Sequence, residues 1–111
     1  MQKLTTTYLR QKRKRLIEQL NEIESAMLRG SLIERHKKCG KSNCWCVDGK
    51  GHGPNYYLSV SMPGTRPIMI YVSVEDKSLV EKALANYREA QQIMEKISDI
   101  NRELLTRKIS F

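Results

Sequence analysis

The sequence predicts an α+β protein with a long helix at each end of the chain and a small antiparallel β-sheet between them. Three observations support this: two segments with the apolar spacing of a helix, two short β-rich runs joined by a Pro-Gly pair, and one segment that holds all three cysteines. A chain of 111 residues fits a single domain, here 1–111, with only a modest core.

The first predicted helix covers residues 5–29. It contains strong helix formers and no proline, and Gly30 then supplies a C-terminal stop because glycine adopts the left-handed cap conformation easily. Its apolar residues recur at spacings of three, four and seven, which marks one helical face: Leu9, Leu16, Leu20, Ile23 and Met27.

The middle region, residues 31–72, contains the predicted strands. "SLIERHKK" is short and mixed and predicts a strand that leads into the cysteine segment. "NYYLSVSM" and "RPIMIYVSV" are β-branched and aromatic, and Pro63 followed by Gly64 supplies the residue pair of a type II turn between them. These two runs predict a hairpin, with a free edge near Pro67 because proline lacks a backbone donor.

The second predicted helix covers residues 74–107. The Ser73 hydroxyl can cap its first amides, with Asp76 completing a weak capping box. An apolar stripe follows at alternating spacings of three and four residues, and Ile93 and Ile100 widen it: Val80, Ala83, Tyr87, Ala90, Met94, Ile97 and Leu104. Antiparallel packing of the two helices would bury both stripes, and the same stripe could also pair with a second copy to form a homodimer.

The segment "CGKSNCWCVDGKGH" has the pattern of a metal site. Cys39, Cys44, Cys46 and His52 are spaced C-x4-C-x-C-x5-H, and three thiolates with one imidazole form a complete tetrahedral set for Zn²⁺. Because no coordination position stays open for water, we expect structural zinc that makes this segment a zinc-binding loop between the two helices. The glycines around the ligands allow a tight loop.

Two alternatives compete with this interpretation. His36 could replace His52 as the fourth donor, although a strand would turn its side chain away from that of Cys39, so the spacing favours His52. The thiols could also be unliganded or form a redox switch. An odd number of cysteines cannot pair completely within one chain, and disulfides are rare in the cytoplasm, which is the compartment we expect.

The run "RGSLIERHKKCGKSNCWCVDGKGHGPNYYLS", residues 29–59, resembles a family of small uncharacterised bacterial proteins. That family, a domain of unknown function, carries RGSL, CGK-x2-C-x-C and GHGP-x-YYLS signatures between two helices. The resemblance implies a zinc-binding module at Cys39, Cys44, Cys46 and His52. It implies no activity.

Basic residues exceed acidic residues by eight, and the sequence pI is near 9.6, so the electrostatic field favours polyanions. Two groups of candidate contacts stand out, one in the first helix and one around the cysteine segment, and together they could form a groove for phosphates. The candidates are Arg10, Lys12, Arg13, Lys14, Arg15, Arg35, Lys37, Lys38, Lys41, Trp45 and Lys50. Trp45 could stack on unpaired bases; of Tyr56 and Tyr57 one is expected in the core, and Tyr71 is expected to pack.

We therefore expect a non-catalytic, zinc-stabilised protein that binds RNA or DNA without sequence specificity, since no helix-turn-helix or zinc-finger register is present. The alternative is an adaptor that docks an acidic protein partner through its helices and zinc loop. An enzyme is not expected, because no acid-base pair or phosphate-binding G-x4-G-K-[ST] motif occurs. Neither a signal peptide nor a membrane span is expected, so we predict a cytoplasmic protein.

Overall fold

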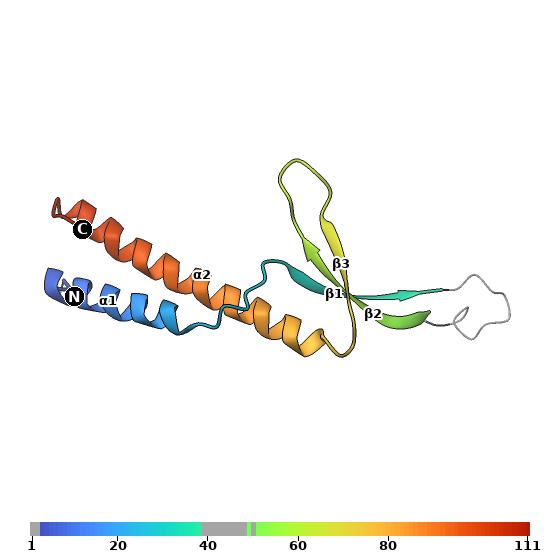
Figure 1. The fold of residues 1–111 in the computed structure, drawn as a ribbon. Coiled ribbons are helices and arrows are strands. Elements are labelled where there is room, and N and C mark those ends of the chain that lie inside the picture. The colour runs from blue at the N-terminus through green and yellow to red at the C-terminus, as the bar shows by residue number, and fades with distance from the viewer. Residues whose placement is uncertain (1–2, 39–48, 50) are drawn as a thin grey trace. The chain divides into compact units, whose positions relative to one another are not determined.

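The computed structural model describes residues 3–38, 49 and 51–111. In chain order, its elements are α1 (Thr6–Glu22), β1 (Ser31–Lys37), β2 (His52–Val60), β3 (Ile68–Val72) and α2 (Lys77–Thr106), drawn in Figure 1. Two helices and one three-stranded antiparallel sheet confirm the predicted α+β class. The chain divides into two compact units, Met1–Met27 with Ala85–Phe111, and Leu28–Leu84.

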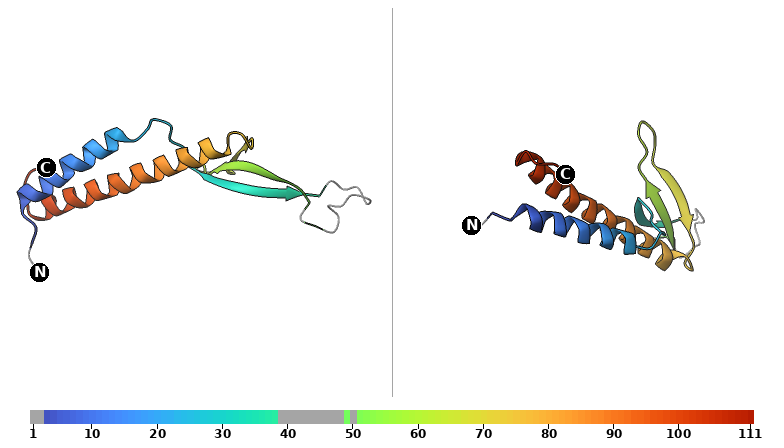
Figure 2. Two further views of the ribbon diagram at one scale, coloured as in Figure 1. Left: turned by 90° about the horizontal axis from the view of Figure 1, so that it is seen from below. Right: turned by 60° about the vertical axis from the view of Figure 1, so that its left-hand side comes forward.

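The first unit is built by α1 and the part of α2 that follows residue 84, which lie side by side in Figures 1 and 2. Apolar residues of both helices form one buried cluster, and Leu104 at its centre has no exposed surface. The buried members are Leu9, Leu16, Ile93, Ile100 and Leu104, with Leu20, Ile23, Ile97 and Ile109 partly buried against them. The apolar stripes predicted from the sequence therefore form this core, and α1 covers that stretch of the α2 stripe.

The predicted end of the first helix at residue 29 is wrong, because α1 ends at Glu22. Its start agrees with the prediction, since the Thr5 hydroxyl caps the helix by accepting from the Tyr8 amide at 3.1 Å. Beyond the helix, the Asn86 side-chain amide donates to the Ala26 carbonyl oxygen at 3.0 Å. Contacts of this kind satisfy backbone groups without a further helical turn, so tertiary context overrides the helix propensity of residues 23–29.

Gly30 does not cap a helix, as the sequence had suggested, but immediately precedes β1. Its φ of 145° is one that L side chains rarely adopt. A Cβ built on Gly30 would lie 2.7 Å from the Ser59 carbonyl oxygen, so the chain enters the sheet through a contact that only glycine permits.

The second unit contains the sheet, in the order β1-β2-β3, so β1 and β3 are its edges. β1 pairs with β2 from Ser31↔Ser59 to Lys37↔His52, and β2 pairs with β3 from Tyr56↔Val72 to Val60↔Ile68. This confirms the predicted hairpin, and Gly64 in its connection has the positive φ, 68°, that a type II turn requires. One face of the sheet packs on a second buried cluster of Leu58, Val72 and Leu84, joined by Leu28, Leu32, Tyr56, Val60 and Val80.

The second helix begins at Lys77 instead of residue 74. The predicted cap is present one turn earlier, where the Ser73 hydroxyl accepts from the Asp76 amide at 3.2 Å. Within the predicted stripe, Met94 is 49% exposed, whereas Leu84, which the prediction omitted, is buried in the core of the second unit. Within the described part of the chain, no helix has the length and apolar character needed to cross a membrane.

Candidate nucleic-acid interface and metal segment

The β1–β2 ladder holds the two ends of the cysteine segment together. It extends as far as the pair Lys37↔His52. Beside this pair, a Cβ built on Gly51 would lie 2.8 Å from the Lys38 backbone nitrogen, so the two backbones are in close contact at this point. Cys39 follows Lys38 in the sequence, so the first predicted sulfur ligand is one residue from this contact, as is His52.

The two histidines occupy neighbouring strands at this end of the sheet. The His36 Nε2 lies 3.3 Å from the Glu34 Oε1, and its side chain is 25% exposed. His52 is half-buried at the first position of β2. Cys39, Cys44 and Cys46 lie outside the described residues, and among the described ones no group of three or more His, Cys, Asp or Glu could hold a metal.

The five basic residues predicted to bind nucleic acid in the first helix do not share one face. Consecutive helical residues are about 100° apart, so a run from 10 to 15 surrounds the helix. Arg13 is half-buried, and its guanidinium donates to the Asn101 Oδ1 at 2.7 Å and to the Phe111 backbone oxygen. Arg10 donates to the Ser110 carbonyl oxygen at 2.8 Å. These two arginines hold the residues that follow α2 against α1.

The other three basic residues of the group, Lys12, Lys14 and Arg15, are exposed. Within the described part of the chain they form neither a hydrogen bond nor an ion pair. These three side chains can therefore pair with a phosphate without breaking a described contact within the protein.

The second predicted group lies at the other unit of the chain. Arg35, Lys37 and Lys38 are exposed in or next to β1, while Lys41, Trp45 and Lys50 lie outside the described residues. The guanidinium carbon of Arg35 lies 5.8 Å from the centre of the Tyr57 ring, within the range of a cation–π contact. Because the two groups belong to different units, the groove between them stays a prediction.

The tyrosines of β2 face opposite sides of the sheet, as strand alternation requires. Tyr56 packs against the buried cluster of the second unit, and the Lys77 Nζ lies 4.6 Å from its ring centre. Tyr57 meets Tyr71 of β3 edge to face, with ring centres 5.8 Å apart and an interplanar angle of 74°. Tyr71 packs, as expected, but against the Tyr57 ring and outside the core, where it is 61% exposed.

The sequence itself indicates that Tyr71 lies outside the core. Val72 and Tyr71 are neighbours in a strand, so only one of them can face the core, and the smaller, purely apolar valine does so at 5% exposure.

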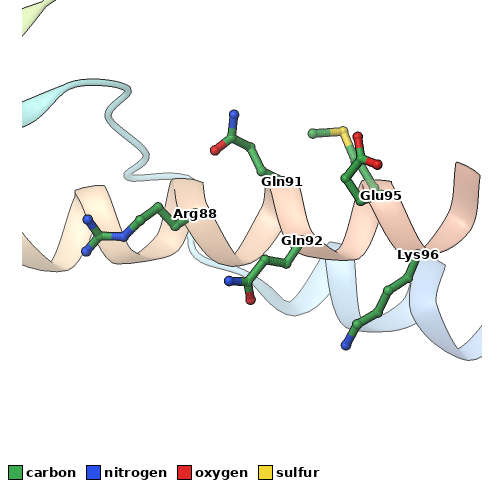
Figure 3. Close-up of a pocket in the computed structure, with 6 residues that line it drawn as sticks. Arg88, Gln91, Gln92, Glu95 and Lys96 are labelled. Carbon is green, nitrogen blue, oxygen red and sulfur yellow. The ribbon is translucent and has the colours of Figure 1, made fainter.

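A surface depression on α2, shown in Figure 3, is lined by side chains of that helix alone: Arg88, Gln91, Gln92, Met94, Glu95 and Lys96. No polar or charged residue is buried anywhere in the described part of the chain. Desolvation shifts the pKa of a catalytic acid or base when that group is buried, and none of the residues that line this depression is buried.

A family model described as a domain of unknown function matches residues 3–82, which include α1, the whole sheet and the start of α2. The chain belongs to the DUF6788 family. Membership of DUF6788 agrees with the resemblance to an uncharacterised family, and the description of that family names no activity. Searches of curated proteins and of solved structures give no match.

Proposed function

We propose that this chain is a small basic protein, stabilised by structural zinc, that binds RNA or DNA without sequence specificity and without catalysis. The observation that carries the proposal is a set of exposed cations, Lys12, Lys14 and Arg15, which form no hydrogen bond or ion pair within the described residues of a chain whose formal net charge is +8. Each lysine or arginine that neutralises a phosphate releases counterions, and this release drives binding that does not depend on base sequence.

The proposed zinc is bound by Cys39, Cys44, Cys46 and His52. The close approach of Gly51 to Lys38 supports it, because the β1–β2 ladder holds the two ends of the segment side by side. Joined ends reduce the conformational entropy that the ligands lose when they gather around one ion. We favour His52 over His36 because His52 directly follows Gly51 at this close contact, whereas His36 lies within β1.

Docking of an acidic protein along the α2 stripe has weaker support. α1 already covers Ile93, Ile100 and Leu104, so this part of the stripe is buried within the chain. A partner helix would have to displace α1 to reach these residues. The exposed cations need no such rearrangement before they meet a polyanion.

Titration of the full chain with labelled nucleic acid tests the proposal. The probes are a single-stranded oligonucleotide, a duplex of the same sequence, and labelled polyglutamate of similar length as a polyanion without bases or phosphates. We expect nucleic acid to bind more tightly than polyglutamate, with log K falling linearly with log salt concentration. Absence of nucleic-acid binding at low salt, or equal binding of polyglutamate, contradicts the proposal and favours an acidic protein partner.

The choice of histidine is tested by a matched pair of variants, His52→Ala and His36→Ala. We expect His52→Ala to weaken zinc binding strongly, because an open coordination position replaces the imidazole. His36→Ala should bind zinc like the unchanged chain. Competition with a chromogenic chelator measures both affinities, and a loss confined to His36→Ala would assign the ligand to the other strand.

A further inference from the structure

One face of the sheet packs on the core through β1, β2 and Val72, whereas β3 is exposed from Ile68 to Tyr71. On the opposite face, Ile33 and Tyr57 are half-buried. On the packed face, Leu58 is 4% exposed and Val72 is 5% exposed. Side chains alternate along a strand, so the neighbours of these residues lie on the opposite face. The register places Ile33, Tyr57 and Tyr71 in one row across all three strands of that opposite face.

This row is more apolar than an exposed sheet face usually is, because the solvated side of an antiparallel sheet normally carries polar residues. Tyr71 is 61% exposed, and Met69, two residues before it on the same face, is 38% exposed. Tyr71 and Tyr57 are in edge-to-face contact, so the row presents two adjoining rings. An exposed apolar row of this kind is a candidate binding surface.

The same face carries positive charge. Arg35 lies over the Tyr57 ring. Lys37 is exposed two residues beyond Arg35 in β1, past an irregularity in the β1–β2 register that lies between these two residues. None of the strand residues on this face is acidic. The unit Leu28–Leu84 contains nine lysines and arginines and five acidic residues, an excess of four positive charges.

We propose that this face binds single-stranded nucleic acid, with an unpaired base stacked on the exposed Tyr71 ring and backbone phosphates held by Arg35 and Lys37. The inference rests on the proposed function and names the form of nucleic acid and the residues that receive it. Aromatic side chains on a sheet stack on unpaired bases, whereas the bases of a duplex stack on each other and are closed to such contact. The cations beside the rings match the charge of the sugar-phosphate chain.

A second copy of the chain is the main competing occupant, since β3 is an edge strand. A symmetric dimer places the same surface on both sides of the interface. Packing of this face on a second copy would cover the Arg35 charge with a face whose strand residues include no acidic partner for it, and this opposes such an association. A polyanion supplies a partner of opposite charge.

The test is the affinity of the full chain for a labelled thymidine homopolymer, which stays single-stranded, and for a labelled duplex. The variant Tyr71→Ala removes a ring that is mostly exposed, and Tyr71→Phe restores the ring without the hydroxyl. Tyr8→Ala is the matched control, because Tyr8 is a 40% exposed tyrosine of the first unit. The slope of log K against log salt is measured for each variant.

For Tyr71→Ala we expect a loss of about tenfold in affinity for the single strand, with an unchanged salt slope, because stacking releases no counterions. Tyr71→Phe and Tyr8→Ala should bind like the unchanged chain. Arg35→Gln should lower the salt slope by about 0.7, the value of one phosphate contact on a single strand.

Two results separate this inference from the proposed function. If the chain binds the single strand and Tyr71→Ala binds equally well, the sheet face is not the site, while nucleic-acid binding itself stands. If the chain binds neither probe at low salt, the proposed function and this inference both fail. If Tyr71→Ala converts a dimer in solution to a monomer without a change in affinity, the face makes contact between copies, and the inference is overturned.

Discussion

Replacement of Arg13 by alanine separates a structural cation from a binding cation in α1. The Arg13 guanidinium donates to the Asn101 Oδ1 at 2.7 Å and to the Phe111 backbone oxygen, and its side chain is half-buried. Hydrogen bonds from a charged group contribute about 1.5–3 kcal/mol to stability when they are well shielded. Because part of this site is open to water, we expect a loss of about 1–2 kcal/mol for Arg13→Ala.

For a chain of this size, a loss of 1 kcal/mol lowers the Tm by about 4–8 °C. The assay is thermal unfolding followed by circular dichroism, with single-strand binding measured on the same samples. Lys14→Ala and Arg15→Ala are the matched controls, since both residues are exposed on the same helix. These controls should keep the Tm and lower the salt slope by about 0.7 each, whereas Arg13→Ala should lower the Tm and keep the slope. An unchanged Tm with a reduced slope for Arg13→Ala would refute the structural role of Arg13.

Three further predictions concern the core, the backbone and the metal segment. Leu104→Ala should destabilise by about 2–5 kcal/mol because the side chain is fully buried, while Leu105→Ala, at 63% exposure, should stay near zero; urea unfolding compares them. Gly30→Ala should lower the Tm more than Gly64→Ala, since both have positive φ but only the former places a Cβ 2.7 Å from a carbonyl oxygen; equal Tm values would contradict this. Cys44→Ser should lower the Tm through loss of a ligand, and an unchanged melting curve would argue against a structural metal.

The sequence predicts the elements whose residues repeat over a long stretch or carry specific turn chemistry. Leu9, Leu16, Ile93 and Ile100 enter the core as their spacing indicates. The Pro63-Gly64 turn joins the two strands expected on either side of it. In these cases local pattern and tertiary packing agree, which is why the pattern suffices.

The sequence does not predict the places where a contact with a distant residue determines the local structure. Residues 23–29 have good helix formers, but α1 ends at Glu22, and the Leu28 amide donates to the Ala83 carbonyl oxygen at 3.1 Å instead. Nothing near Leu28 in the sequence indicates a partner so far along the chain. For the candidate site, the composition indicates that the chain binds a polyanion. It does not indicate that Arg10 and Arg13 donate hydrogen bonds to residues 88 to 100 positions later, in α2 or after it, so the structural role of these two arginines was not predictable.

We propose that Cys39, Cys44, Cys46 and His52 bind one zinc ion. The most direct measurement is the zinc content of the full chain after purification and after refolding with zinc, by elemental analysis against protein concentration. We expect one equivalent of zinc for each chain, retained through gel filtration and lost in the variant Cys44→Ser. A folded chain that retains no zinc after refolding with the metal would contradict it.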